Sequence, residues 1–138
     1  MISQTKVTVR YAETDQMGIV HHSVYPIWYE VARTETIKKI GMTYSELEKM
    51  GIMIPLVELN CKYHLPAKYE DELCIKVEIT KLTPARIVFE YQVCRQENNE
   101  IINTGSTIHA WVGNDFKPIN FKKQFPIIFE KINQLVQH

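Results

Sequence analysis

The sequence predicts an α+β fold, with one antiparallel sheet and a long helix packed against one face of it. Two observations carry this prediction. A single helical pattern of about 18 residues lies in the N-terminal third of the chain. Four consecutive strand-like stretches follow it, separated by short turn-rich breaks, and this order favours antiparallel pairing. The length of 138 residues fits a single domain over residues 1–138.

The N-terminal third is predicted to be a strand, a loop and the long helix. Residues 5–11 alternate apolar and polar side chains, as a half-buried strand does. Residues 12–22 contain an aspartate and a glycine and are predicted to be a loop. We expect the helix to begin near Ser23, a residue type favoured at helix starts, with Pro26 in its first turn. Gly41 is the expected end of this helix.

The rest of the chain is predicted to be a short helix, four strands and a final helix. Thr43-Tyr44-Ser45-Glu46 is a capping-box pattern, which predicts a second helix that runs to Lys49. The strand-like stretches are 52–65, 72–82, 86–96 and 101–112, and an amphipathic helix is expected over 125–136. One face of the sheet is then left for other cover, and a partner subunit is one way to provide it.

Composition excludes several classes of protein. Sixteen basic residues balance sixteen acidic ones, which argues against a nucleic-acid-binding protein. No run approaches the roughly 20 apolar residues of a membrane span, and the N-terminus lacks a signal-peptide pattern, so a cytoplasmic location is expected. The three cysteines show no C-x-x-C spacing, and we expect them to be reduced core residues. We expect no metal site and no cofactor.

The segment 11–25 concentrates the chemistry of the sequence. It holds Asp15, Gly18 and the pair His21-His22 directly before the predicted helix start. A helix N-terminus offers free backbone N–H groups that polarise a carbonyl, and a nearby carboxylate acts as a general base or a nucleophile. On residue types alone, an aspartate in such a loop is more often a turn or capping residue, and a lone glycine is usually a turn glycine.

The same segment resembles the signature of hot-dog-fold acyl-CoA thioesterases of the 4-hydroxybenzoyl-CoA thioesterase type. The matching residues are Tyr11, Glu13, Thr14-Asp15, Gly18, Ile19-Val20, His21-His22, Tyr25, Trp28-Tyr29-Glu30 and Ala32-Arg33. A second patch comprises Val57-Glu58-Leu59, Tyr63, Pro66-Ala67, Tyr69 and Asp71, and a looser third one is 86–91. This resemblance implies a hot-dog fold, in which the antiparallel sheet wraps around one long central helix. Met17 and His21 depart from the residues common in that family.

The resemblance implies catalytic roles for two residues, Asp15 and His22. Asp15 matches the catalytic carboxylate, which either activates water or attacks the thioester. His22 matches the residue at the helix start, whose backbone N–H holds the thioester oxygen and whose side chain assists proton transfer or orientation. Gly18 is expected to let the loop approach the substrate. Tyr25 is expected either to pack beside the acyl or pantetheine arm or to serve helix packing.

Further substrate-binding residues are expected outside this loop. The family's sites usually sit between subunits, so Val57 and Glu58 are expected to line the acyl site from a second copy in a homodimer or homotetramer. Arg86 is a candidate for binding the phosphates of coenzyme A, as are Lys62 and Lys68.

The expected function is therefore hydrolysis of an acyl-CoA thioester to a free acid and coenzyme A. Three alternatives stay open on the sequence alone: hydrolysis of an acyl group carried on acyl carrier protein, another chemistry on the same fold such as dehydration, and a non-catalytic module that binds acyl-CoA.

Overall fold

A computed structural model describes residues 1–136. Five strands form one sheet in the order β1-β3-β4-β5-β2, and every pair of neighbours is antiparallel. The strands are β1 (Ser3–Thr8), β2 (Leu56–Tyr63), β3 (Glu72–Leu82), β4 (Arg86–Arg95) and β5 (Ile101–Ala110). The predicted α+β class and the antiparallel sheet are confirmed.

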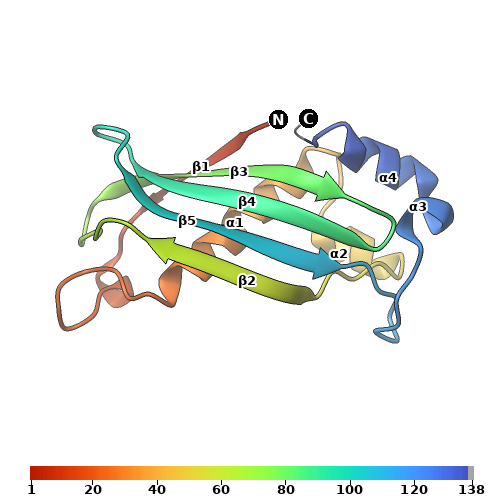
Figure 1. The fold of residues 1–138 in the computed structure, drawn as a ribbon, viewed down its shortest axis with the longest axis horizontal. Coiled ribbons are helices and arrows are strands. Elements are labelled where there is room, and N and C mark those ends of the chain that lie inside the picture. Colours follow the sequence, from red (N-terminus) through yellow and green to blue (C-terminus); the bar gives the residue numbers. More distant parts are fainter. Residues whose placement is uncertain (137–138) are drawn as a thin grey trace.

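The long helix α1 (Val24–Lys38) crosses one face of this sheet, and the two together form the core (Figure 1). Its buried side chains are Val24, Tyr25, Trp28, Tyr29, Ala32, Thr36 and Ile37. The Tyr29 ring stacks on Tyr91 of β4 with 4.1 Å between ring centroids. Beside them, Gly105 of β5 leaves room for the Tyr29 ring, because a Cβ there would lie 2.8 Å from Tyr29 Cε2. The helix therefore sits close against the sheet.

The opposite face of the sheet is mostly polar. The side chains that alternate with the buried ones on β3, β4 and β5 include Lys76, Glu78, Glu90, Gln92, Thr104 and Ser106. Water can cover such a face, and the expectation that a partner subunit covers it stays a prediction. Apolar exposure lies elsewhere, at Ile27 and Val31 on the outer side of α1 and along the edge strand β2.

The shorter helices are α2 (Tyr44–Lys49), α3 (Phe121–Gln124) and α4 (Pro126–Asn133), with a 3₁₀ turn η1 at Tyr11–Glu13. The predicted cap of α2 is confirmed, since Thr43 Oγ1 accepts a hydrogen bond of 3.2 Å from the Glu46 N–H. No helix among residues 1–136 is long and apolar enough to cross a membrane.

Several predicted boundaries are wrong. The first strand ends at Thr8 rather than at residue 11, and β2 occupies only the middle of the predicted run 52–65. Ser23 precedes α1 as predicted but makes no side-chain cap, because its backbone is already helical (φ −73°, ψ −13°). Its hydroxyl instead lies 2.8 Å from His21 Nδ1.

Candidate active site

The loop between η1 and α1 is a tight turn built around Asp15. The Asp15 N–H donates to the Ile19 carbonyl at 2.9 Å, and the Gly18 N–H donates to the Asp15 carbonyl at 2.9 Å. Asp15 Oδ1 accepts from the Met17 N–H at 2.8 Å. Gly18 adopts φ +81°, a backbone conformation that glycine takes without steric cost. Asp15 is thus a turn residue, and the same turn holds its carboxylate in one orientation.

Asp15 lines a pocket of about 390 Å³. The lining comes from the Asp15 loop, the start of α1 and the end of β2, namely Asp15, Met17, Ile19, Val20, His22, Tyr25, Tyr63, His64, Leu65 and Pro66. The fold therefore brings together Asp15, His22 and Tyr25, with Gly18 in the turn beside them.

The backbone at the start of α1 leaves the N–H group of His22 free within residues 1–136, and His22 lines the same pocket as Asp15. The His21 N–H donates to the Glu13 carbonyl at 2.9 Å, the Ser23 N–H to His21 Nδ1 at 3.2 Å, and the Val24 N–H to the His21 carbonyl at 3.0 Å. The His22 N–H makes no hydrogen bond within residues 1–136. A free donor at a helix start suits the oxygen of a polarised carbonyl.

The ring and carbonyl of His22 are also placed by neighbours. Its ring lies against that of His21, with 4.1 Å between the two centroids. The Tyr63 hydroxyl donates to the His22 carbonyl at 2.9 Å, which ties the helix start to the end of β2. Because the Ser23 N–H donates to His21 Nδ1, the proton of a neutral His21 ring is on Nε2.

The buried Glu13 connects the Asp15 loop to helix α1 by hydrogen bonds. Its carboxylate accepts from the Arg10 N–H at 2.7 Å and from Trp28 Nε1 at 3.0 Å, and its carbonyl accepts the His21 N–H. The residue is 7% exposed. A buried carboxylate is stable only when such donors satisfy it, so Glu13 fixes the positions of η1 and α1 relative to each other.

Tyr25 packs in the core and lines the pocket, while its contact with the acyl or pantetheine arm stays a prediction. It is buried in the core, where its ring meets those of Trp28 and Tyr63 edge-on at 5.2 and 5.5 Å, and it also lines the pocket. Burial, reinforced by the neighbouring Tyr63, raises the pKa of Tyr25 to about 12. The phenol therefore stays protonated at neutral pH.

Three other predicted residues lie away from this pocket within one chain. Val57 and Glu58 are at the beginning of β2, whereas the pocket is at its end. Glu58 pairs with Ile108 and so shares the polar face of the sheet. Arg86 pairs with Ala110, seven residues along β5 from the Asn103 that pairs with Tyr63, which is about 23 Å. The chain alone does not bring Arg86 to Asp15.

The sequence alone predicted no individual site role for five residues that line or support the pocket, namely Tyr63, His64, Leu65, Pro66 and Glu13. Tyr63 and Pro66 belong to the second patch of the family resemblance, which was the available signal for them. Among residues 1–136, no group of three or more His, Cys, Asp or Glu side chains is arranged to hold a metal ion.

Comparison with known proteins places this chain in a family. The model of the Thioesterase superfamily matches residues 17–102, beginning two residues after Asp15. YneP of Bacillus subtilis, provisionally named an acyl-CoA thioesterase, is 39% identical over 126 residues, which is 91% of this chain and 91% of that protein. The acyl-CoA thioester hydrolase YbgC of Escherichia coli is 32% identical over 92 residues, covering 67% of this chain and 69% of YbgC.

A solved structure agrees with these matches. The DHNA-CoA thioesterase of Staphylococcus aureus superimposes with a TM-score of 0.90 at 35% identity, over 96% of this chain and 89% of that one. Because the family match spans more than half of the chain and the fold agrees over almost all of it, the chain belongs to the thioesterase superfamily.

Proposed function

We propose that this protein hydrolyses acyl-CoA thioesters, with Asp15 as the catalytic carboxylate. One observation carries the proposal: Asp15 and His22, whose backbone N–H is free within residues 1–136, line the same pocket at the start of α1. Hydrolysis of a thioester needs a group that supplies or becomes the nucleophile and a donor for the oxygen that becomes negative. The relatives named for acyl-CoA hydrolysis support coenzyme A as the carrier.

In the reaction, the thioester carbonyl oxygen accepts a hydrogen bond from the His22 N–H. Asp15 then follows one of two routes. As a general base, it takes a proton from water while the water oxygen attacks the carbonyl carbon. As a nucleophile, it attacks that carbon itself and forms an anhydride, which water cleaves afterwards. In both routes the C–S bond breaks, coenzyme A leaves as a thiolate that takes a proton, and the acyl group leaves as a free acid.

The orientation of the Asp15 carboxylate suits either route. The Met17 N–H occupies Oδ1, and no hydrogen bond within residues 1–136 involves Oδ2. One oxygen therefore fixes the orientation of the carboxylate while the other is available for chemistry. Tyr25, which stays protonated, can donate a hydrogen bond to the substrate from the pocket wall.

We propose further that the protein acts as a homodimer joined at the edge strand β2. The outer edge of β2 carries unpaired backbone groups, and its side chains Leu56, Val57, Leu59 and Tyr63 are 42–52% exposed. Ile27 and Val31 of α1 add further exposed apolar surface at helical spacing. A second copy of this chain would cover these groups by continuing the sheet.

Such a dimer supports the expected role of Val57. Two copies of one strand that pair antiparallel about a two-fold axis place the beginning of each against the end of the other. The partner's Val57 would then lie near Tyr63, which lines the Asp15 pocket. Glu58 would accompany it on the polar face of the sheet. We propose this shared pocket as the acyl site.

The cytoplasm is the location that we propose for the enzyme. Cys61, Cys74 and Cys94 are all unpaired, and Cys74 and Cys94 are buried. Unpaired buried cysteines suit a reducing compartment.

A thiol-release assay tests the proposed function. The protein is incubated with short, medium, long and aromatic acyl-CoA thioesters and with acyl groups on acyl carrier protein, and binding of the same compounds is measured in parallel. We expect turnover of at least one acyl-CoA. Binding of acyl-CoA without release of thiol from any of them would contradict the proposal and favour a binding module. If only the thioesters of acyl carrier protein are hydrolysed, the carrier is acyl carrier protein and not coenzyme A.

A further inference from the structure

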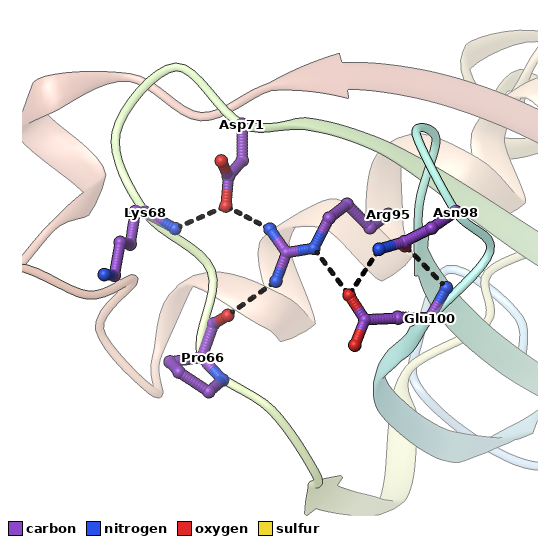
Figure 2. A network of polar contacts seen from close by, with 6 residues as sticks. All are labelled: Pro66, Lys68, Asp71, Arg95, Asn98 and Glu100. Carbon is purple, nitrogen blue, oxygen red and sulfur yellow. Dashed lines mark hydrogen bonds and ion pairs between the residues drawn. The ribbon is translucent and has the colours of Figure 1, made fainter.

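Arg95, the last residue of β4, joins three segments of the chain (Figure 2). Its guanidinium forms an ion pair with the Asp71 carboxylate, donates to the Pro66 carbonyl at 3.1 Å, and lies 3.5 Å from Glu100 Oε1. The Lys68 N–H donates to the same Asp71 oxygen at 2.9 Å. The loop 66–71, between β2 and β3, is thus held at three of its six residues.

The Arg95–Asp71 pair is shielded from water more than an ordinary surface ion pair. The side chains of Arg95 and Asp71 are 18% and 27% exposed, whereas those of the pair Lys38–Glu35 on α1 are 49% and 51% exposed. Exposed pairs contribute little, while a shielded guanidinium that makes several directed hydrogen bonds fixes the geometry of its partners. Arg95 therefore sets where loop 66–71 lies.

Loop 66–71 in turn holds the Asp15 loop. The Ala67 carbonyl accepts the Val20 N–H at 2.8 Å, and Lys68 forms a β-bridge with Ile19. Ala67 is fully buried, so the local packing fixes its position. The Ile19 carbonyl then accepts the Asp15 N–H at 2.9 Å. The end of β4, loop 66–71 and the Asp15 loop therefore contact one another in series, and they connect Arg95 with the Asp15 carboxylate.

Loop 66–71 also contributes Pro66 to the wall of the pocket. Pro66, whose carbonyl Arg95 binds, lines the pocket together with Asp15. A shift of Pro66 and Ala67 would therefore displace the pocket wall and the catalytic turn together. A displacement of about 1 Å at a reacting group can lower a rate on the order of 100-fold.

We infer that Arg95 is a positioning residue for this active site, which acts through Pro66 and Ala67 and does not itself touch the substrate. The inference rests on the proposed function for its effect on catalysis. Its effect on the Asp15 loop does not depend on that function.

The test compares Arg95→Gln and Arg95→Lys with the unmutated protein and with Ile132→Val, a control that trims a buried side chain of α4 away from the site. Hydrogen exchange measured by mass spectrometry follows the backbone amides of residues 15–20, and steady-state kinetics separates kcat from KM. In Arg95→Gln we expect these amides to exchange about tenfold faster and kcat to fall at least about tenfold, with KM changed less than about threefold.

Arg95→Lys should recover part of the lost kcat. Its ammonium can still pair with Asp71 but cannot also reach Pro66 and Glu100 in the fixed planar geometry of a guanidinium. Ile132→Val should lower the melting temperature while leaving the exchange of residues 15–20 and kcat unchanged. A purely stabilising role for Arg95 predicts that Arg95→Gln behaves like this control.

The inference is overturned if Arg95→Gln is folded and keeps both the slow exchange and kcat, or if exchange accelerates while kcat stays the same. Should Arg95→Gln not fold, Asp71→Asn is measured instead with the same expectations, since it removes the charge that Arg95 binds. If the unmutated protein hydrolyses no thioester, the proposed function fails, and the exchange of residues 15–20 alone decides whether Arg95 holds the loop.

Discussion

Replacing Glu13 with glutamine tests how the Asp15 loop is attached to the core. Both carboxylate oxygens accept hydrogen bonds, Oε1 from the Arg10 N–H and Oε2 from Trp28 Nε1. A glutamine side chain has one accepting oxygen, and its NH₂ group would face one of these two donors. Glu13→Gln therefore loses one buried hydrogen bond and leaves a donor without an acceptor.

The expected loss of stability in Glu13→Gln follows from the burial of the Glu13 side chain. The Glu13 side chain is 8% exposed, while the Arg10 side chain is 76% exposed, so the guanidinium contributes little to the total. Loss of one buried hydrogen bond to a charged acceptor costs about 2 kcal/mol. For a domain of this length that is a fall in melting temperature of roughly 8 °C. We also expect a lower kcat, because the loop loses its tie to Trp28 of α1.

Calorimetry of Glu13→Gln beside Glu130→Gln provides the measurement. Glu130 lies exposed on α4 and serves as the matched control, with an expected change in melting temperature below about 2 °C. An equal melting temperature for the two variants would refute the reasoning, because it would mean that the buried carboxylate is replaceable by any polar group of its shape.

Three further predictions concern the core, pH and assembly. Gly105→Ala should destabilise the protein by about 3 kcal/mol in chemical denaturation, since the new methyl would meet the Tyr29 ring, whereas Ser106→Ala on the polar face should be nearly neutral. Burial, with a smaller contribution from Arg33, lowers the pKa of His109 to about 4. As the pH falls, the unfolded chain therefore binds this proton before the folded protein does. The free energy of unfolding should fall as the pH drops from about 6.5 to 4, by up to about 3 kcal/mol. His109→Gln should flatten this dependence, and an unchanged slope would contradict it. Leu59→Asp on β2 should shift the mass in analytical ultracentrifugation from dimer to monomer, while Lys76→Asp on the polar face should not.

Periodicity and capping patterns sufficed where local sequence determines structure. The strand predicted over 72–82 coincides with β3, and the helix after Thr43 forms with the expected cap. Elements that depend on distant contacts were missed or misplaced. Tyr11, the last residue of the predicted strand, instead begins the 3₁₀ turn Tyr11–Glu13, in which Glu13 accepts a hydrogen bond from the distant Trp28 Nε1. The short helix α3 was missed, although Asn120 caps it; its Phe121 also stacks on the distant Trp111, with 3.7 Å between ring centroids.

The candidate site also combines a part that local sequence predicts with a part that depends on distant contacts. Its loop, 11–25, is continuous in sequence, and membership in the thioesterase superfamily, which that segment suggested, is confirmed. The pocket wall from Tyr63 to Pro66 comes from the end of β2 and the residues after it, some 40 residues further on, and tertiary contacts bring it to the loop. The catalytic role of Asp15 stays a prediction.

That role is tested most directly by kcat for Asp15→Asn beside Asp115→Asn. Both aspartates accept a backbone N–H two residues ahead, Asp15 from Met17 at 2.8 Å and Asp115 from Lys117 at 3.0 Å, and an asparagine oxygen can keep either bond. Asp115 lines no part of the Asp15 pocket, so the two changes differ in chemistry and not in turn geometry. We predict that Asp15→Asn lowers kcat at least about 100-fold with an unchanged melting temperature, while Asp115→Asn stays within about twofold of the unmutated enzyme. Full activity in a folded Asp15→Asn protein would contradict the assignment of the catalytic carboxylate.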